Sequence, residues 1–413
     1  MRSPLPLLSA LACISSFPMC AIAAAEDYTQ WAHSRELALN TSATGASITV
    51  DQIGFPVLIS LSAQQSDVFD EAQAGGADMR FSTMAGAHLA YQIEAWDKAA
   101  IWVRVDTVKA GKAAQGLRMH WGKTGAPDSS DGKSVFPAAN GFQGVWHLGN
   151  SVDDASGAAH NGVDSGTVAA ADGRIGTARY FDNPDAYVKN TGKYIALGNP
   201  ADMNLAGRIT MEAWVKWIKR DQHRIILCHG AATGVNFETV LRIGETLDYR
   251  AGTWTTAAHY ATLVTPLADS NAWVHLAGVY SGTAWTLYRN GVMVSELADT
   301  NGAKPTTGNW RIGAEYASTS ATMGSVTRFF HGWMDEVRLS GVARSADWIK
   351  LGYENQKEGQ TLVTIGPTVT AVAGRTAGAK PKRGLSQGFT RRKILYAIPD
   401  KDERTDAIGV RAP

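Results

Sequence analysis

The chain has 413 residues, which is long enough for two domains with full hydrophobic cores. Hydrophobic residues make up 45% of it and charged residues 19%, a balance that excludes a disordered chain. The formal net charge of +1 argues against a nucleic-acid-binding protein, because such a protein carries a basic surface.

Glycine and tryptophan are both abundant, at 42 and 13 residues. This pairing favours many short strands joined by tight turns, with large rings filling the core of a sandwich. We therefore expect an all-β chain, in which a small N-terminal β-sandwich precedes a larger antiparallel sandwich.

The first 25 residues have the pattern of a secretory signal peptide. Arg2 is their only charge, an apolar stretch covers residues 5–14, and residues 23–25 are three alanines that suit cleavage. The apolar stretch is shorter than the roughly 20 residues that span a bilayer, although an uncleaved anchor is the alternative. We therefore expect export to the periplasm, the cell surface or the medium.

Residues 26–47 are polar, and we expect a leader segment there. From residue 48 to residue 140, short strand-like runs follow one another without helical periodicity, which predicts a small β-sandwich domain. These runs are 57–61, 79–81, 100–105 and 117–122.

Residues 141–358 are predicted to form a second β domain. In its clearest strand, 209–217, apolar residues alternate with polar ones, except that Trp214 places a large ring on the polar face. Asn290 and Gly291 stand between two strand-like runs and supply the two positive-φ positions of a type I′ hairpin turn.

The end of the second domain predicts a helix and then a change of character. Ser345 can cap a short helix that continues through Tyr353. Beyond Pro367 the character of the chain changes, and the basic run 391–393 heads a segment without the alternation of a strand. A truncated or frame-shifted end is the alternative for this part of residues 359–413. We expect residues 359–413 to form a basic, disordered tail.

Ten segments of the second domain, taken together, resemble bacterial LamG-like domains. They are 146–148, 154–157, 160–162, 173–178, 180–181, 209–217, 273–277, 288–291, 332–338 and 342–346. The resemblance covers about 141–356 in the order of the family. It implies a two-sheet jelly roll of the concanavalin A-like lectin/glucanase superfamily.

The first domain resembles a domain of unknown function that often precedes LamG-like domains in bacterial envelope proteins. The matching segments are 78–81, 89–91, 94–96, 101–103 and 135–136. Proteins with this pairing are often associated with biopolymer-transport proton channels of the ExbB/TolQ type. The resemblance therefore implies a membrane transport complex as a partner in trans.

A glycoside hydrolase needs two carboxylates about 5 to 10 Å apart across the scissile bond. Strand 209–217 carries a single acid, Glu212. Asp335 and Glu336 are adjacent, so we expect their side chains to point to opposite faces of their strand. Neither strand supplies the pair, and we predict no catalytic residues. A site assembled from distant strands stays open.

Other catalytic signatures are missing from the sequence, among them the nucleophile elbow, the zinc-protease motif and the phosphate-binding loop. His147, His275 and His331 lie in strand-like runs beside Trp or Phe, so we expect hydrogen-bonding roles for them. Cys228 is the only cysteine beyond the signal segment, and its apolar neighbours predict a buried thiol without a disulfide.

Calcium is the one cofactor we expect, in a structural role. Asp153, Asp154, Asn161 and Asp164 cluster in a Gly-rich loop, and their oxygens are ligands that Ca²⁺ prefers. In the LamG-like resemblance, Asp335 is a candidate to join this loop. The alternative for each residue is turn formation by its own side chain.

Trp214 and Trp254 are the predicted ligand-binding residues, because exposed rings stack face-on against sugar rings. Trp214 is on the polar face of its strand, and Trp254 lies in the loop-like segment 251–256. The alternative for either ring is the core, which must hold most of the 13 tryptophans.

Three functions fit these observations. The one we favour is a non-catalytic exported module that binds a glycan or an envelope protein, as an accessory to a transport or surface complex. The second is a carbohydrate-active enzyme with an unrecognised site. The third is an adhesin-like spacer, which the lack of internal repeats disfavours.

Overall fold

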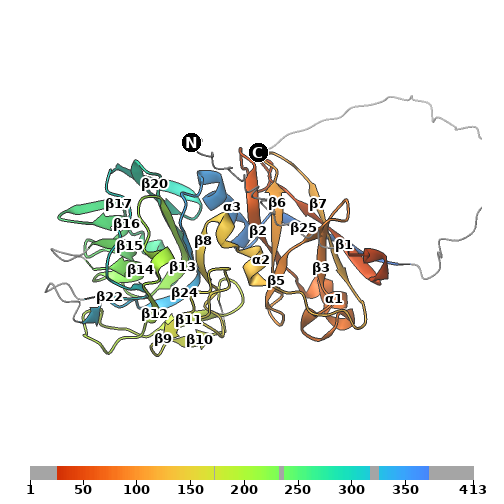
Figure 1. Cartoon of the computed structure of the whole chain (residues 1–413), viewed down its shortest axis with the longest axis horizontal. Helices are drawn as coiled ribbons and strands as arrows, with labels where there is room; N and C mark the ends of the chain where they lie inside the picture. The colour runs from red at the N-terminus through yellow and green to blue at the C-terminus, as the bar shows by residue number, and fades with distance from the viewer. Residues whose placement is uncertain (1–25, 172, 232–236, 317–324, 372–413) are drawn as a thin grey trace, which may run out of the picture. The chain divides into compact units, whose positions relative to one another are not determined.

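Figure 1 shows the computed structural model of the chain, in which residues 26–171, 173–231, 237–316 and 325–371 are described. Up to Ala371 the chain is one compact unit. It consists mainly of strands in antiparallel sheets, which confirms the all-β prediction. The predicted signal peptide and the tail beyond residue 371 lie outside the described residues.

Helices are few and short in the described part of the chain. The α-helices are α1 Ser66–Glu71, α2 Gly132–Val135 and α3 Ala346–Gln356. The 3-10 turns are Tyr28–Gln30, Ala63–Gln65, Ala74–Gly76, Ala138–Asn140, Ala201–Met203 and Leu267–Asp269. No described helix has the length and apolarity needed to cross a membrane.

The first domain is a small β-sandwich, as predicted. One sheet has the order β25-β1-β7-β3-β4 and the other the order β2-β6-β5. The strands of the first sheet are β25 Val363–Thr370, β1 His33–Leu39, β7 Gln115–Trp121, β3 Arg80–Thr83 and β4 His88–Leu89. Those of the second are β2 Gln52–Ser60, β6 Ala100–Val108 and β5 Tyr91–Ala95. Side chains of both sheets, such as Phe81 and Val103, share one buried core.

Two strands of this sandwich lie where no strand was predicted. β1 falls in the expected leader 26–47, and β25 falls in the expected tail 359–413. The two strands pair with each other, and β1 also pairs with β7. Val363 is buried and Ile365 packs against the first core, so the chain returns to its first domain after completing the second. Pro367 is tolerated because β25 is an edge strand.

The second domain has two large sheets packed face to face. The eight-stranded sheet has the order β10-β11-β24-β13-β18-β19-β20, with β8 also paired to β24. Its strands are β10 Val168–Ala170, β11 Ala178–Phe181, β24 Gly332–Ser340, β13 Ile209–Trp217, β18 Val274–Tyr280, β19 Ala284–Arg289, β20 Val292–Ala298 and β8 Phe142–Trp146.

The seven-stranded sheet has the order β17-β16-β15-β14-β21-β12-β9. Its strands are β17 Ala258–Val264, β16 Asp248–Trp254, β15 Glu238–Ile243, β14 Arg224–Gly230, β21 Trp310–Ile312, β12 Ile195–Gly198 and β9 Val163–Asp164. A two-stranded ribbon joins β22 Glu315–Tyr316 to β23 Val326–Thr327. Apolar residues from both large sheets fill the core between them, which confirms the predicted sandwich.

Three local predictions in the second domain are confirmed. Strand β13 has the predicted bounds. Asn290 and Gly291 have φ values of 51° and 74°, as the type I′ hairpin between β19 and β20 requires. The Ser345 side chain accepts a hydrogen bond from Trp348 N and caps helix α3.

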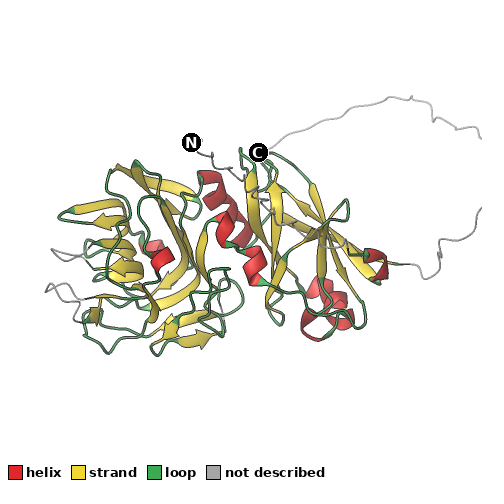
Figure 2. Ribbon diagram, viewed as in Figure 1, coloured by secondary structure: helices red, strands yellow, loops and turns green. Residues whose placement is uncertain are grey.

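Helix α3 lies between the strands of the two domains (Figure 2). On one side the Asn355 amide pairs with the backbone of Leu58, at 2.7 Å to its N–H and 3.0 Å to its carbonyl oxygen. On the other side the helix covers the outer face of the eight-stranded sheet, where Ala277 and Val279 join the core of the first domain. The central strands β13 and β18 of that sheet are therefore buried on both faces.

Candidate binding site on the seven-stranded sheet

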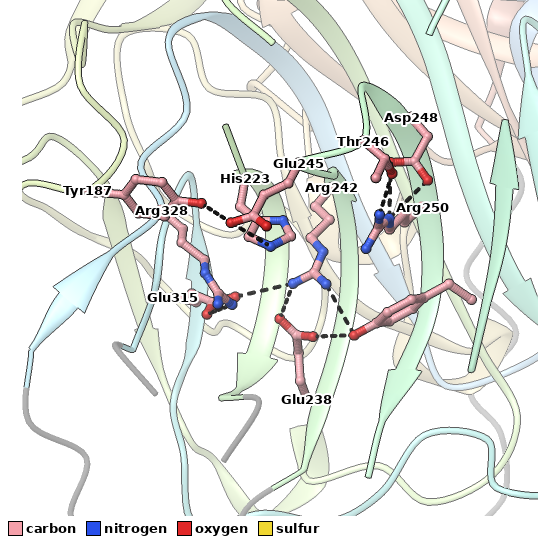
Figure 3. A network of polar contacts seen from close by, with 11 residues as sticks. Tyr187, His223, Glu238, Arg242, Glu245, Thr246, Asp248, Arg250, Glu315 and Arg328 are labelled. Atoms are coloured by element: carbon pink, nitrogen blue, oxygen red, sulfur yellow. Dashed lines mark hydrogen bonds and ion pairs between the residues drawn. The ribbon is translucent and has the colours of Figure 1, made fainter. Parts of the chain in front are cut away.

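The outer face of the seven-stranded sheet carries a cluster of charged side chains. Strand alternation places Leu241 and Ile243 of β15 in the core, so Glu238 and Arg242 point the other way. Strand β17, which is separated from β15 by β16, contributes Tyr260. Figure 3 shows Glu238 and Arg242 with the acids and arginines that surround them.

Arg242 is at the centre of this cluster. Its guanidinium donates to Glu238 at 2.8 Å and to the Tyr260 hydroxyl at 3.1 Å, and that hydroxyl donates to Glu238 at 2.8 Å. A second carboxylate, Glu315, lies 3.6 Å from Arg242 and also pairs with Arg328. Two acids and two arginines therefore share one buried network.

The two carboxylates of the network have opposite pKa shifts. Burial opposes the charged form of Glu238, but the charge of Arg242, together with hydrogen bonds and the charge of Arg328, lowers the pKa of Glu238 to about 2. Burial, and then the charge of Glu238, raises the pKa of Glu315 well above its usual range. The surroundings therefore favour the charged form of Glu238 and the protonated form of Glu315.

A pocket of about 310 Å³ opens beside this network. Its lining residues are His223, Arg242, Glu245, Thr246, Arg250, Trp254, Ala258, Tyr260 and Arg328. Arg250 is fixed by Asp248, 2.9 Å away, and donates to the Thr246 hydroxyl at 2.7 Å. Burial, and then the positive charge of Arg242, lowers the pKa of His223 to about 3. The pocket therefore presents oriented N–H donors and a neutral imidazole.

Trp254 belongs to this pocket, at the end of β16, where its side chain is partly exposed. Of the two tryptophans predicted to bind a ligand, it is the one placed beside hydrogen-bonding groups. The sequence pointed to the ring but not to its neighbours, because His223 and Arg328 reach the pocket from other parts of the chain.

Trp214, the other predicted ligand-binding residue, lies outside this pocket and is only 2% exposed. Its indole donates to Gln356 at 2.6 Å, and its ring stacks on Tyr353 at 5.7 Å between centroids. The expectation of an exposed ring is therefore wrong at Trp214, because α3 covers the polar face of β13. Periodicity within a strand does not reveal what packs on its second face.

His275 is buried beside Trp214, and burial lowers its pKa to about 3. Above pH 6.5 the His275 ring is neutral in both the folded and the unfolded chain. Below pH 6.5 only the unfolded chain gains a proton at this histidine, so stability falls as the pH decreases, by about 2 kcal/mol per such histidine at pH 5.

We predict that His275→Gln reduces the stability lost between pH 7 and pH 5 by about 2 kcal/mol. Urea unfolding at both pH values measures it, and an unchanged loss would contradict the assignment.

The residues predicted to bind calcium have other partners in the structure. Asp154 accepts four hydrogen bonds through its two carboxylate oxygens, from its own loop and from β8. Asn161 accepts from the backbone of Asp154, Asp153 from a serine hydroxyl, and Asp335 from a backbone N–H. The loop around Asp154 is therefore held by hydrogen bonds to its own side chains, which was the alternative to a metal site. Because these oxygens already accept hydrogen bonds, the residues do not fit a Ca²⁺ site. Calcium binding elsewhere stays a prediction.

The expectation that Asp335 and Glu336 point to opposite faces is wrong. The register of β24 against β13 shifts here, so that two residues of β24 face one residue of β13. Met334 and Val337 both enter the core, and the two acids between them lie on the other face. Glu336 has a φ of 50°, as an extra residue in a β-bulge can have. The outer face therefore holds adjacent acids that alternation does not predict.

Two family models match the chain. Residues 189–350 match the concanavalin A-like lectin/glucanases superfamily. The chain therefore contains a concanavalin A-like domain. Residues 75–149 match a domain of unknown function, DUF2341, and this range runs from the first domain through the whole of β8. Neither match concerns transport, so the expected association with a biopolymer-transport complex finds no support in them. No curated protein matches this sequence.

Several solved structures resemble part of this chain. Domain 4 of AbnA, a GH43 extracellular arabinanase from Geobacillus stearothermophilus in complex with arabinotriose, is 16% identical, with a TM-score of 0.36 over 51% of this chain and 97% of that one. The binding domain of Paraclostridial Mosquitocidal Protein 1 is 12% identical, with a TM-score of 0.39 over 52% of each chain. A SAP-like pentraxin from Limulus polyphemus is 14% identical, with a TM-score of 0.29 over 39% of this chain and 83% of that one. Scores this low carry no argument about function.

Proposed function

We propose that the concanavalin A-like domain binds a glycan in the pocket on the outer face of its seven-stranded sheet. The observation that carries this proposal is the combination of the partly exposed Trp254 ring with fixed guanidinium donors in one pocket. Its volume of about 310 Å³ suits a small ligand. Arg250 and Arg328 each have five N–H donors, more than their acid partners occupy, and these suit the oxygens of a sugar.

Binding is favoured over hydrolysis by the burial of the acids. Glu238 and Glu315 are each 0% exposed, and Glu238 already accepts from Arg242 and Tyr260. A general acid must reach the glycosidic oxygen, and a nucleophile must reach the anomeric carbon. Acids covered by the walls of the pocket reach neither, so they hold the donors of the site in position.

The same two acids favour a second candidate function, a glycoside hydrolase. Oxygens of Glu238 and Glu315 lie within 4.8 Å of each other, and their pKa values are shifted in opposite directions. Such a pair resembles the acid and the nucleophile of a retaining enzyme, whose carboxyl groups are about 5 Å apart. A hydrolase would release sugar from a polysaccharide, and Glu315→Gln would stop the release.

We predict that Trp254→Ala weakens glycan binding about tenfold, because an aromatic contact contributes about 1.5 kcal/mol. Its effect on stability should stay below about 1 kcal/mol, since the ring is only partly buried. Trp333→Ala is the matched control, because Trp333 is a partly buried ring on the other large sheet. Calorimetric titration with the bound glycan measures both variants, and equal affinities for them would contradict the proposal.

A glycan array, with and without EDTA, tests the proposed function itself. Binding that Trp254→Ala reduces supports a glycan-binding module, and loss of that binding in EDTA would add a dependence on calcium. Absence of binding to the array, together with sugar release from polysaccharides, would overturn the proposal in favour of the hydrolase. We also propose that the protein acts outside the cytoplasm, because of the signal-peptide pattern of residues 1–25.

A further inference from the structure

A second polar cluster lies where the first domain meets the eight-stranded sheet. Glu94 comes from β5 of the first domain, His147 follows β8, and Glu336 is the bulge residue of β24. The His147 Nδ1 atom lies 2.6 Å from Glu336 Oε1 and 3.4 Å from Glu94 Oε2. One donor atom from each residue falls within 4.8 Å of the other two. Three groups that can bind a metal therefore converge on one point.

Each of these three side chains is oriented by a further partner. His147 Nε2 lies 3.1 Å from Gln92 Oε1, which leaves Nδ1 toward the acids. Glu336 accepts from Arg338 at 2.6 Å through its other oxygen, and Glu94 accepts from the Trp102 indole at 2.7 Å. Side chains that bind metals usually have such partners, which fix the ring and the carboxylates.

A cavity of about 270 Å³ reaches the cluster, with Glu94 and His147 in its wall. Asp335 lies on the same face of β24 and is 0% exposed, and its Oδ1 atom has no hydrogen-bond partner in the described part of the chain. Two further carboxylates, Glu94 and Glu336, therefore lie near this buried oxygen, and Arg338 pairs with one of them. A buried carboxylate oxygen without a partner, close to an imidazole and two other carboxylates, is a group that a bound cation would satisfy.

We propose that Glu94, His147 and Glu336 bind a divalent transition-metal ion, with zinc as the representative. The site offers one imidazole nitrogen and two carboxylates in a small space. Zinc accepts this set of ligands and completes its coordination with water from a cavity. Calcium needs six to eight oxygen ligands, which this cluster does not offer. Because Glu94 belongs to the first domain, the ion would also tie that domain to the second.

Another cluster in the described residues, formed by Cys228, Glu238 and Glu315, offers three donor atoms at similar spacing. It is the weaker candidate, because Arg242 already contacts both of its acids and Arg328 contacts Glu315. It serves instead as an internal control. Cys228→Ser removes one of its donors without touching Glu94, His147 or Glu336.

Calorimetric titration of the chelator-treated full chain with Zn²⁺ tests the proposal. We expect one bound ion per chain, affinity at least tenfold lower in Glu94→Gln, and unchanged affinity in Cys228→Ser. Glu94→Gln keeps the shape of the side chain and an acceptor for Trp102. Absence of binding, equal affinity in wild type and Glu94→Gln, or loss of binding in Cys228→Ser would each overturn the assignment.

A spectroscopic measurement keeps the test valid if the variants fold poorly. In wild-type protein with ¹⁵N-labelled histidine, Zn²⁺ should shift the ring nitrogens of a single histidine. His147→Gln should remove that signal, and thermal unfolding should show that Zn²⁺ stabilises the wild type more than Glu94→Gln. A shift of a different histidine, or of none, contradicts the proposal without affecting the glycan pocket on the other sheet.

Discussion

Replacing Arg242 with methionine is expected to destabilise the concanavalin A-like domain by about 3–5 kcal/mol. The guanidinium is buried, donates to Glu238 and Tyr260, and lies 3.6 Å from Glu315. Its removal leaves the charge of Glu238 in a buried site without its main counter-charge, and that cost exceeds the loss of packing. Guanidinium chloride unfolding, followed by intrinsic tryptophan fluorescence, measures the effect.

Two controls separate this electrostatic effect from a general loss of packing. Adding Glu238→Gln to Arg242→Met removes the unpaired charge, so we expect the double variant to be more stable than Arg242→Met alone. Arg250→Met removes a more exposed guanidinium from the same pocket and should cost less than about 1 kcal/mol. Equal destabilisation by Arg242→Met and Arg250→Met would show that the buried network does not stabilise the domain.

Local signals in the sequence predicted the parts of the fold that depend on neighbouring residues. The hairpin forms at Asn290 and Gly291 because its turn needs a positive φ at two successive positions, and Asn followed by Gly adopts these angles more readily than other residue pairs. The cap at Ser345 forms because its hydroxyl accepts from a backbone N–H three residues later. These structures depend on short-range geometry, which a sequence pattern contains directly.

Contacts between distant residues explain the predictions that were wrong. Strand β25 contains an alternating apolar pattern, but its partner β1 lies more than 300 residues earlier, and neither strand is recognisable without the other. The bulge at Glu336 adds a residue to β24 and reverses the face of every side chain expected after it. A single shift in register thus concealed the position of Glu336, which we propose as a metal ligand.

The candidate pocket was predictable only in part, for the same reason. Glu238 and Arg242 are separated by an even number of positions in one strand, so a shared face could have been inferred from their spacing. Glu315 begins strand β22 and Arg328 follows strand β23. The sequence gives no sign that these two residues lie near Arg242. Trp254 was identified as an aromatic ring that could stack on a sugar, but its segment was expected to be loop-like and is instead the end of strand β16.

The Trp214→Ala variant separates the structural tryptophan from the proposed ligand-binding one. We expect it to destabilise the protein by about 3–5 kcal/mol, because the ring is 2% exposed and its removal leaves a cavity. The indole also holds α3, through the hydrogen bond to Gln356 and the contact with Tyr353. Those two residues lie three apart on one face of the helix, so the loss would loosen α3 from the sheet.

Comparing the stabilities of Trp214 variants with that of Trp254→Ala tests whether the Trp214 ring has a structural role. Trp214→Phe keeps most of the packing but leaves the Gln356 side chain without its donor, so it should cost about 1–3 kcal/mol. Unfolding of all three variants in urea should rank Trp214→Ala as the least stable and Trp254→Ala as the nearest to wild type. If Trp214→Ala instead kept its stability and lost glycan binding, the outer face of the eight-stranded sheet would be the binding surface. Helix α3 would then have to leave that sheet before a ligand could reach it.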